Sequence, residues 1–168
     1  MKVYTQTNID DLIACPKKIS DPPRRDMKLV GGFLRNDMKL LSDGIEGEFS
    51  VFLRQSEDFP ENFSIGLVYD PKDGSGGINL LRCNGQHGIF GGTFDPDHTH
   101  WDYHIHKASE AAIAAGLKPE KYAEKTLQYA SLEQAVQYFM KAIKLDEAEA
   151  KKYFPDRLQG FLPFEEEV

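Results

Sequence analysis

Residues 48–55, with the sequence EFSVFLRQ, decide the fold class of this chain. Phe49, Val51 and Leu53 recur at every second position, as side chains do on the buried face of a β-strand. A helix of this length would bury residues three and four apart instead. The segment therefore predicts a strand with one apolar face, and similar segments lie on both sides of it.

Three neighbouring segments predict further strands: Phe33–Leu41, Phe63–Tyr69 and Ile78–Cys83. Turn-forming residues such as Ser42-Asp43-Gly44 separate them. Short connections between consecutive strands favour antiparallel pairing. We therefore expect an antiparallel sheet of about four or five strands within residues 33–106.

The N-terminal residues 1–30 predict a short helix followed by a basic loop. Thr7 is the expected cap of the helix, Pro16 is expected to stop it, and Pro22-Pro23 disfavours any continuation. Between positions 17 and 39 there are seven basic residues and three acidic ones. This local excess could contact phosphate, but a solvated loop is the simpler interpretation.

The C-terminal residues 107–158 predict helices. Residues 107–115 are rich in alanine and precede Gly116, and Ser131 opens a capping box that is completed by Gln134. Strands followed by helices indicate an α+β fold. We expect one domain over residues 1–168, with the C-terminal helices packed on one face of the sheet.

Composition excludes several classes of protein. The chain has 168 residues, of which 40% are hydrophobic and 28% are charged, so it is neither collagen-like, nor wholly disordered, nor a disulfide-rich miniprotein. The net charge of −7 disfavours general binding to nucleic acid or membrane surfaces. The two cysteines, Cys15 and Cys83, form no CxxC motif, which indicates reduced thiols and a cytoplasmic location. No apolar run is long enough to span a membrane, so no membrane partner is expected.

All five histidines fall between positions 87 and 106, and four of them lie in residues 98–106. With a period of two, this segment would form a strand that buries Thr99, Trp101, Tyr103 and Ile105. The opposite face would carry His98, His100, Asp102, His104 and His106. We predict that this face is offered to a ligand, because random placement would scatter the histidines along the chain.

Alternate residues lie about 6.6 Å apart on a strand, so two imidazoles can converge on one metal ion or one phosphate. They can also serve as acid and base, because imidazole titrates near pH 6.5. Asp102 could orient one of these rings. Arg82 and His87 come from the preceding strand and its turn, and we expect them to face the same site if the two strands pair.

Three functions are consistent with these residues. The first is a phosphodiesterase or ribonuclease-like activity on RNA or a nucleotide, with His104 and His106 as the acid–base pair, His87 as a third group and Arg82 on the phosphate. The second is a non-catalytic protein that sequesters a nucleotide signal or inhibits a protein partner. The third is a metal-dependent enzyme. Its candidate ligands for an ion such as zinc are His98, His100, His104 and His106, and His104-Ile105-His106 with Glu110 resembles the first half of a cupin metal motif.

Two segments resemble an uncharacterised family of small bacterial and phage proteins. They are Leu81-Arg82-Cys83-Asn84-Gly85 with His87, and His104-Ile105-His106-Lys107-Ala108-Ser109-Glu110. The resemblance covers roughly residues 45–145 and implies use of Arg82, His87, His104 and His106, with His98 and His100 as additions to the pattern. It implies no established activity. A looser similarity to small toxins of toxin–antitoxin loci suggests a role in bacterial or phage conflict, including anti-defence.

Overall fold

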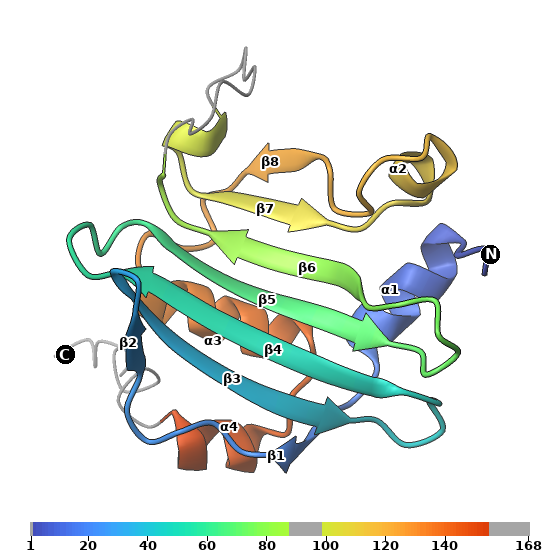
Figure 1. Cartoon of the computed structure of the whole chain (residues 1–168), viewed down its shortest axis with the longest axis horizontal. Helices are drawn as coiled ribbons and strands as arrows, with labels where there is room; N and C mark the ends of the chain where they lie inside the picture. The colour runs from blue at the N-terminus through green and yellow to red at the C-terminus, as the bar shows by residue number, and fades with distance from the viewer. Residues whose placement is uncertain (1, 88–98, 155–168) are drawn as a thin grey trace, which may run out of the picture.

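The computed structural model describes residues 2–87 and 99–154, which form one antiparallel sheet of eight strands with helices (Figure 1). The strands are β1 Lys18–Asp21, β2 Lys28–Val30, β3 Phe33–Leu41, β4 Glu48–Ser56, β5 Phe63–Asp70, β6 Ile78–Asn84, β7 His104–Lys107 and β8 Ala123–Lys125. They pair in the order β1-β3-β4-β5-β6-β7-β8, and β2 pairs with the first residues of β3.

The predicted sheet of four or five strands is wrong, because three short strands extend it. The four long central strands, β3 to β6, lie where the alternation of apolar residues placed them. In contrast, β1 and β2 occupy the expected basic loop, and β8 lies within the expected helical part. Each of these three has only three or four residues, nearly all exposed, so no buried face marks them in the sequence.

The helices are α1 Gln6–Ala14, α2 Glu110–Ala114, α3 Leu132–Ala142 and α4 Glu147–Tyr153, with a short 3-10 helix, η1, at Thr99–Trp101. The expected cap of α3 is confirmed, because the Ser131 side chain accepts a hydrogen bond from the Gln134 amide. The cap of α1 is Thr5 and not Thr7, which lies inside the helix. In the part of the chain that the structure describes, no helix has the length and apolar character needed to cross a bilayer.

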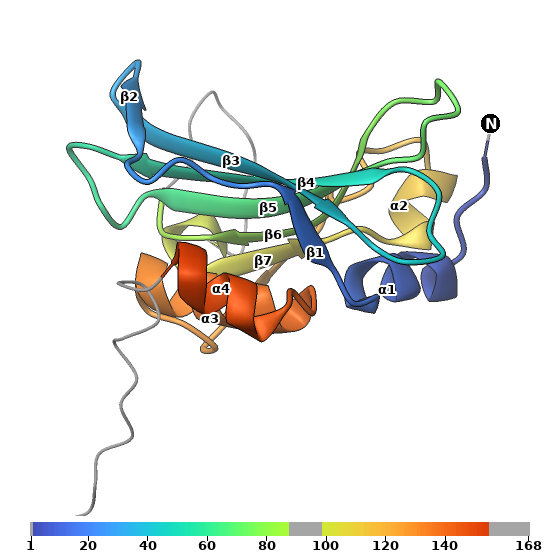
Figure 2. The same cartoon turned by 90° about the horizontal axis from the view of Figure 1, so that it is seen from below.

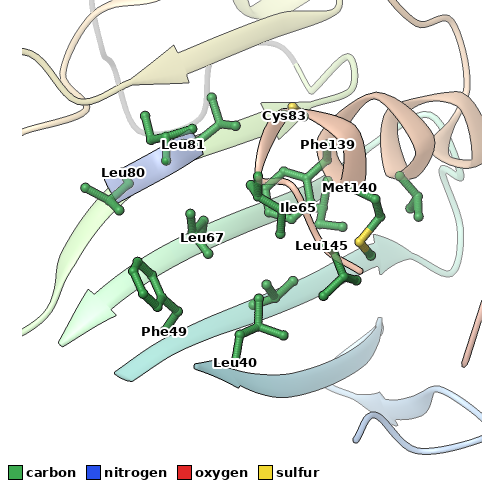
Figure 3. Close-up of a cluster of buried hydrophobic side chains, with 14 of the residues drawn as sticks. Leu40, Phe49, Ile65, Leu67, Leu80, Leu81, Cys83, Phe139, Met140 and Leu145 are labelled. Atoms are coloured by element: carbon green, nitrogen blue, oxygen red, sulfur yellow. The ribbon is translucent and has the colours of Figure 1, made fainter. Parts of the chain in front are cut away.

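The hydrophobic core lies between the sheet and three helices. Figure 2 shows α1, α3 and α4 on the same side of the sheet. Figure 3 shows Ile65 and Leu67 of β5 and Cys83 of β6 on the sheet side of this core, with Phe139 and Met140 of α3 facing them. Each fully buried side chain of this size contributes about 1.5–3 kcal/mol through burial, so this face supplies most of the stability.

Lys17, the first residue of the expected basic loop, is buried rather than solvated. Its ammonium group donates hydrogen bonds to the carbonyl oxygens of Ile13, Cys15 and Ile143 at 2.7–3.0 Å. It also lies 4.8 Å from the centre of the Phe49 ring. Burial lowers the pKa of Lys17. This side chain joins the end of α1 to the end of α3 and is not available to phosphate.

Candidate functional site

The face of the sheet that α1, α3 and α4 leave open carries two rows of polar and aromatic residues. The cross-strand partners in one row are Arg54, Ser64, Asn84 and His104, on β4, β5, β6 and β7. The partners in the second row are Phe52, Gly66, Arg82 and His106. Side chains in such a row point to one face and lie about 5 Å from their neighbours. Because β6 pairs with β7, the condition for Arg82 to face the same side of the sheet as His104 and His106 is met.

The histidine segment is a strand only from His104 onward. His100 lies in η1, and His98 is outside the described residues. Trp101, predicted to be buried, is 58% exposed, whereas His104 and His106, predicted on the face offered to solvent or to a ligand, are 0% and 5% exposed. A 3-10 turn has three residues per turn, so it breaks the period of two and redirects His100.

Three histidines from separate segments, namely the loop after β6, η1 and β7, meet at the end of β6 and the start of β7. The ring centres of His87, His100 and His104 are 4.8–5.1 Å apart in every pairing. One ligand nitrogen from each ring lies within 4.8 Å of the other two. The backbone amide of His87 donates to the carbonyl oxygen of His100 at 3.0 Å, which fixes the two segments side by side.

Hydrogen bonds hold His104 in one tautomer. Its Nδ1 lies 2.8 Å from the carbonyl oxygen of Asp102, and a carbonyl can only accept, so Nδ1 carries the hydrogen. Nε2 therefore offers a lone pair, 3.2 Å from Nε2 of His87 and 3.3 Å from the Asn84 side-chain amide. Ser64 Oγ donates to the oxygen of that amide at 2.9 Å, which sets its orientation.

Tyr129 fastens the strands beneath this cluster. Its hydroxyl lies 2.6 Å from the carbonyl oxygen of His104 and 3.0 Å from that of Asn84, and these two acceptors share its single hydrogen. Its ring packs in the core against Phe63, Tyr103 and Tyr138. The backbone under the histidines is thus held from the core side of the sheet.

His106 has the same tautomer as His104. Its Nδ1 donates to the carbonyl oxygen of Glu120 at 3.0 Å, and its Nε2 is buried without a hydrogen-bond partner among the described residues. Its ring centre lies 5.2 Å from that of His104 and 5.8 Å from that of His100. An unpaired buried nitrogen is costly, so its presence points to a ligand.

Burial keeps both strand histidines neutral. It lowers the pKa of His104 to about 4, against an opposing effect from its bond to the Asp102 carbonyl. It lowers the pKa of His106 to about 3, and the nearby Arg82 charge adds to the effect. Neutral imidazole is the form that binds metal ions, and both rings are in that form at neutral pH.

A pocket of about 280 Å³ opens beside the cluster. Its lining includes Arg82, which the sequence predicted at this site, together with His87, His100 and His106. The structure thus brings together every predicted site residue that it describes, with one exception. The Asp102 carboxylate turns away and pairs with Lys125 at 3.1 Å, so only the Asp102 backbone orients a ring.

Several residues of the site were not foreseen from the sequence. Arg54 and Phe52 of β4 line the pocket, and Ser64 and Asn84 position His104. Their alternation with apolar residues puts them on the open face, but only the register across four strands brings them to the histidines. Glu110, the third residue of the cupin-like motif, accepts a hydrogen bond from the backbone amide of Gln6 at the start of α1.

Comparisons with models of protein families, with curated proteins and with solved structures found no match.

Proposed function

We propose that this protein is a metal-dependent hydrolase whose divalent ion, such as zinc, is held by His87, His100 and His104. One observation carries the proposal: three imidazole nitrogens from separate segments lie within 4.8 Å of one another. Tetrahedral zinc with Zn–N bonds of about 2.0–2.1 Å places two ligand nitrogens roughly 3.3 Å apart. The Nε2 atoms of His87 and His104 are 3.2 Å apart.

The hydrogen bond of His104 supports the same proposal. Metal-binding histidines usually donate their second ring nitrogen to a carbonyl or carboxylate, which fixes the ring and its tautomer. His104 donates Nδ1–H to Asp102 in this way. Three protein ligands leave a coordination position open, as in catalytic zinc sites, where the ion lowers the pKa of water to about 7. The Nε2 of His106, beside His104, has no hydrogen-bond partner among the described residues and would be placed to accept a hydrogen bond from a water molecule there.

This geometry favours the metal-dependent alternative over the metal-free pair. In the metal-free scheme, His104 and His106 would act as one acid and one base. Both rings donate Nδ1–H to a carbonyl and present an Nε2 lone pair, so both are arranged as acceptors. The phosphodiester substrate, the cytoplasmic location and the role in bacterial or phage conflict stay predictions alongside this proposal.

Metal content is the first test. We expect protein purified without chelator to carry about one divalent ion per chain, and the metal-free protein to bind zinc in a calorimetric titration. His100→Ala should weaken that binding by more than about 100-fold, since loss of a supporting residue alone costs 10–100-fold. His106→Asn is the matched control and should retain the ion. Equal binding by His100→Ala would contradict the proposed ligand set.

Hydrolysis is the second readout of the same proteins. The zinc-loaded protein should cleave bis(p-nitrophenyl) phosphate or a short RNA, and EDTA should abolish the activity. His106→Asn should bind zinc but cleave more slowly, because it removes the imidazole that would accept a hydrogen bond from the attacking water. A protein that binds zinc and cleaves neither substrate would favour the non-catalytic binding function.

A further inference from the structure

The pocket beside the histidine cluster is cationic in a chain with a net charge of −7. Arg54 and Arg82 line it, and no aspartate or glutamate among the described residues does so. Free guanidinium groups usually pair with carboxylates. Among the described residues, neither arginine forms an ion pair within 4.0 Å, and the Nε of Arg82 is buried without an acceptor.

Gly66 allows the two arginines to share one pocket. It lies between Phe52 and Arg82 in the cross-strand row, and a Cβ atom there would clash with the Phe52 ring. The ring therefore lies across Gly66 toward the Arg82 strand. The guanidinium of Arg54 sits over this ring, 5.2 Å from its centre. Phe52 thus supports Arg54 on the same face as Arg82.

The positive charges of Arg54 and Arg82 repel each other. Burial lowers the pKa of Arg82, the buried Glu120 partly offsets this, and the charge of Arg54 lowers it further. An anion bound between them would remove this repulsion and satisfy the unpaired Arg82 Nε. Guanidinium groups present planar pairs of N–H donors that match the oxygens of phosphate.

We propose that Arg54 and Arg82 form a subsite for the phosphate oxyanion of the substrate, next to the three-histidine centre. Arg82 pairs directly with His106 across β6 and β7, and His106 lies beside His104 and His100. A phosphate held by the two arginines therefore lies adjacent to the proposed metal position. Its role in catalysis rests on the proposed hydrolase function, whereas its binding of phosphate does not.

The test uses inorganic phosphate and metal-free protein in EDTA, so that phosphate cannot bind through a metal ion. Titration is followed by calorimetry at constant ionic strength. We expect saturable binding that Arg82→Gln and the exposed Arg54→Gln each weaken by about 10-fold or more. Arg25→Gln, which removes an equal charge at an exposed position outside the pocket, should bind as the wild type does. Circular dichroism confirms that each variant is folded.

Two results would overturn the subsite. One is equal phosphate affinity in the wild type, Arg82→Gln and Arg54→Gln. The other is acetate binding as tightly as phosphate, which would assign the pocket to carboxylates.

Zinc titration of the same variants separates the two proposals. If the protein binds zinc but shows no phosphate binding that depends on the arginines, the phosphate subsite is wrong and the metal site stands. If the protein binds no zinc but binds phosphate through the arginines, the metal-dependent hydrolase is wrong and the phosphate subsite stands.

Discussion

The two faces of the central strands are built from alternate residues of the same segments, yet they serve different purposes. On the helix-covered face, Leu53, Ile65 and Cys83 are cross-strand partners and are almost fully buried. The sequence neighbours of these three residues, Arg54, Ser64 and Asn84, are cross-strand partners on the open face. The comparison shows that the apolar face can hold the sheet together while the open face is free to carry chemistry. A register slip of one residue would exchange the two faces.

The difference in burial between the two faces disappears at β7. His104 and His106 lie on the open face, but both are as buried as core residues. The rings of His87 and His100 pack against His104, and the Glu120 carbonyl binds His106. Polar groups are thus buried on the face that α1, α3 and α4 leave open, and buried titratable groups beside a pocket mark a candidate functional site.

The largest effect should come from breaking the helix-covered face. Phe139→Ala removes a fully buried ring from α3 and should lower the free energy of unfolding by about 3–5 kcal/mol. Phe52→Ala removes the same ring from the open face, where it is half-buried, and should cost clearly less. Urea denaturation of both variants measures the difference. Equal losses would mean that the two faces contribute alike to stability.

A smaller effect for each pH unit should follow from acidification of the metal-free protein. In the unfolded chain, histidine gains a proton near pH 6.5, whereas His104 and His106 gain theirs only near pH 4 and 3 when folded. The unfolded state binds more protons in this window, so stability falls as pH falls from 6.5 toward 4. Each histidine should contribute about 1.4 kcal/mol per pH unit.

Urea denaturation at several pH values measures this dependence. His106→Asn should remove about one histidine's share of the slope between pH 6.5 and 5, before most carboxylates titrate. An unchanged slope in this variant would show that His106 does not stay neutral in the folded protein.

The smallest effect should come from the rim of the site. Asp102→Asn breaks the ion pair with Lys125, in which both side chains are 52% exposed, and should cost less than about 1 kcal/mol. Zinc affinity should not change, because the Asp102 backbone and not its carboxylate orients His104. Calorimetric titration checks this. A loss of 10-fold or more in zinc affinity would assign the carboxylate a role in orienting the ligand.

The parts of the fold that could be predicted are those with a long buried face. Strands β3 to β6 have seven to nine residues each, so the alternation of apolar residues is repeated often enough to be recognised. Strands β1, β2 and β8 are held by backbone hydrogen bonds to a neighbour and bury little of their own. The pattern of apolar and polar side chains therefore does not predict strands that are held mainly by backbone hydrogen bonds.

The site was predictable to the extent that it is local. The crowding of histidines after position 86 indicated residues that come together in the structure, and Arg82 lies on the same face as His106. The predicted strand began too early, at residue 98 instead of His104, because no residue pattern in 99–101 indicates a 3-10 turn. Arg54 lies on β4, two strands from Arg82, so only the observed register could connect them.

The hydroxyl of Tyr129 makes completion of the site a late event in biosynthesis. A ribosome adds residues from the N-terminus, so His87, His100 and His104 emerge well before the side chain that fastens the Asn84 and His104 carbonyls. A nascent chain that has emerged only through β7 carries all three proposed ligands but lacks this fastening. The bonds that hold the two strands from the core side can therefore form only after the segment just before α3 has been synthesised and has folded onto the sheet.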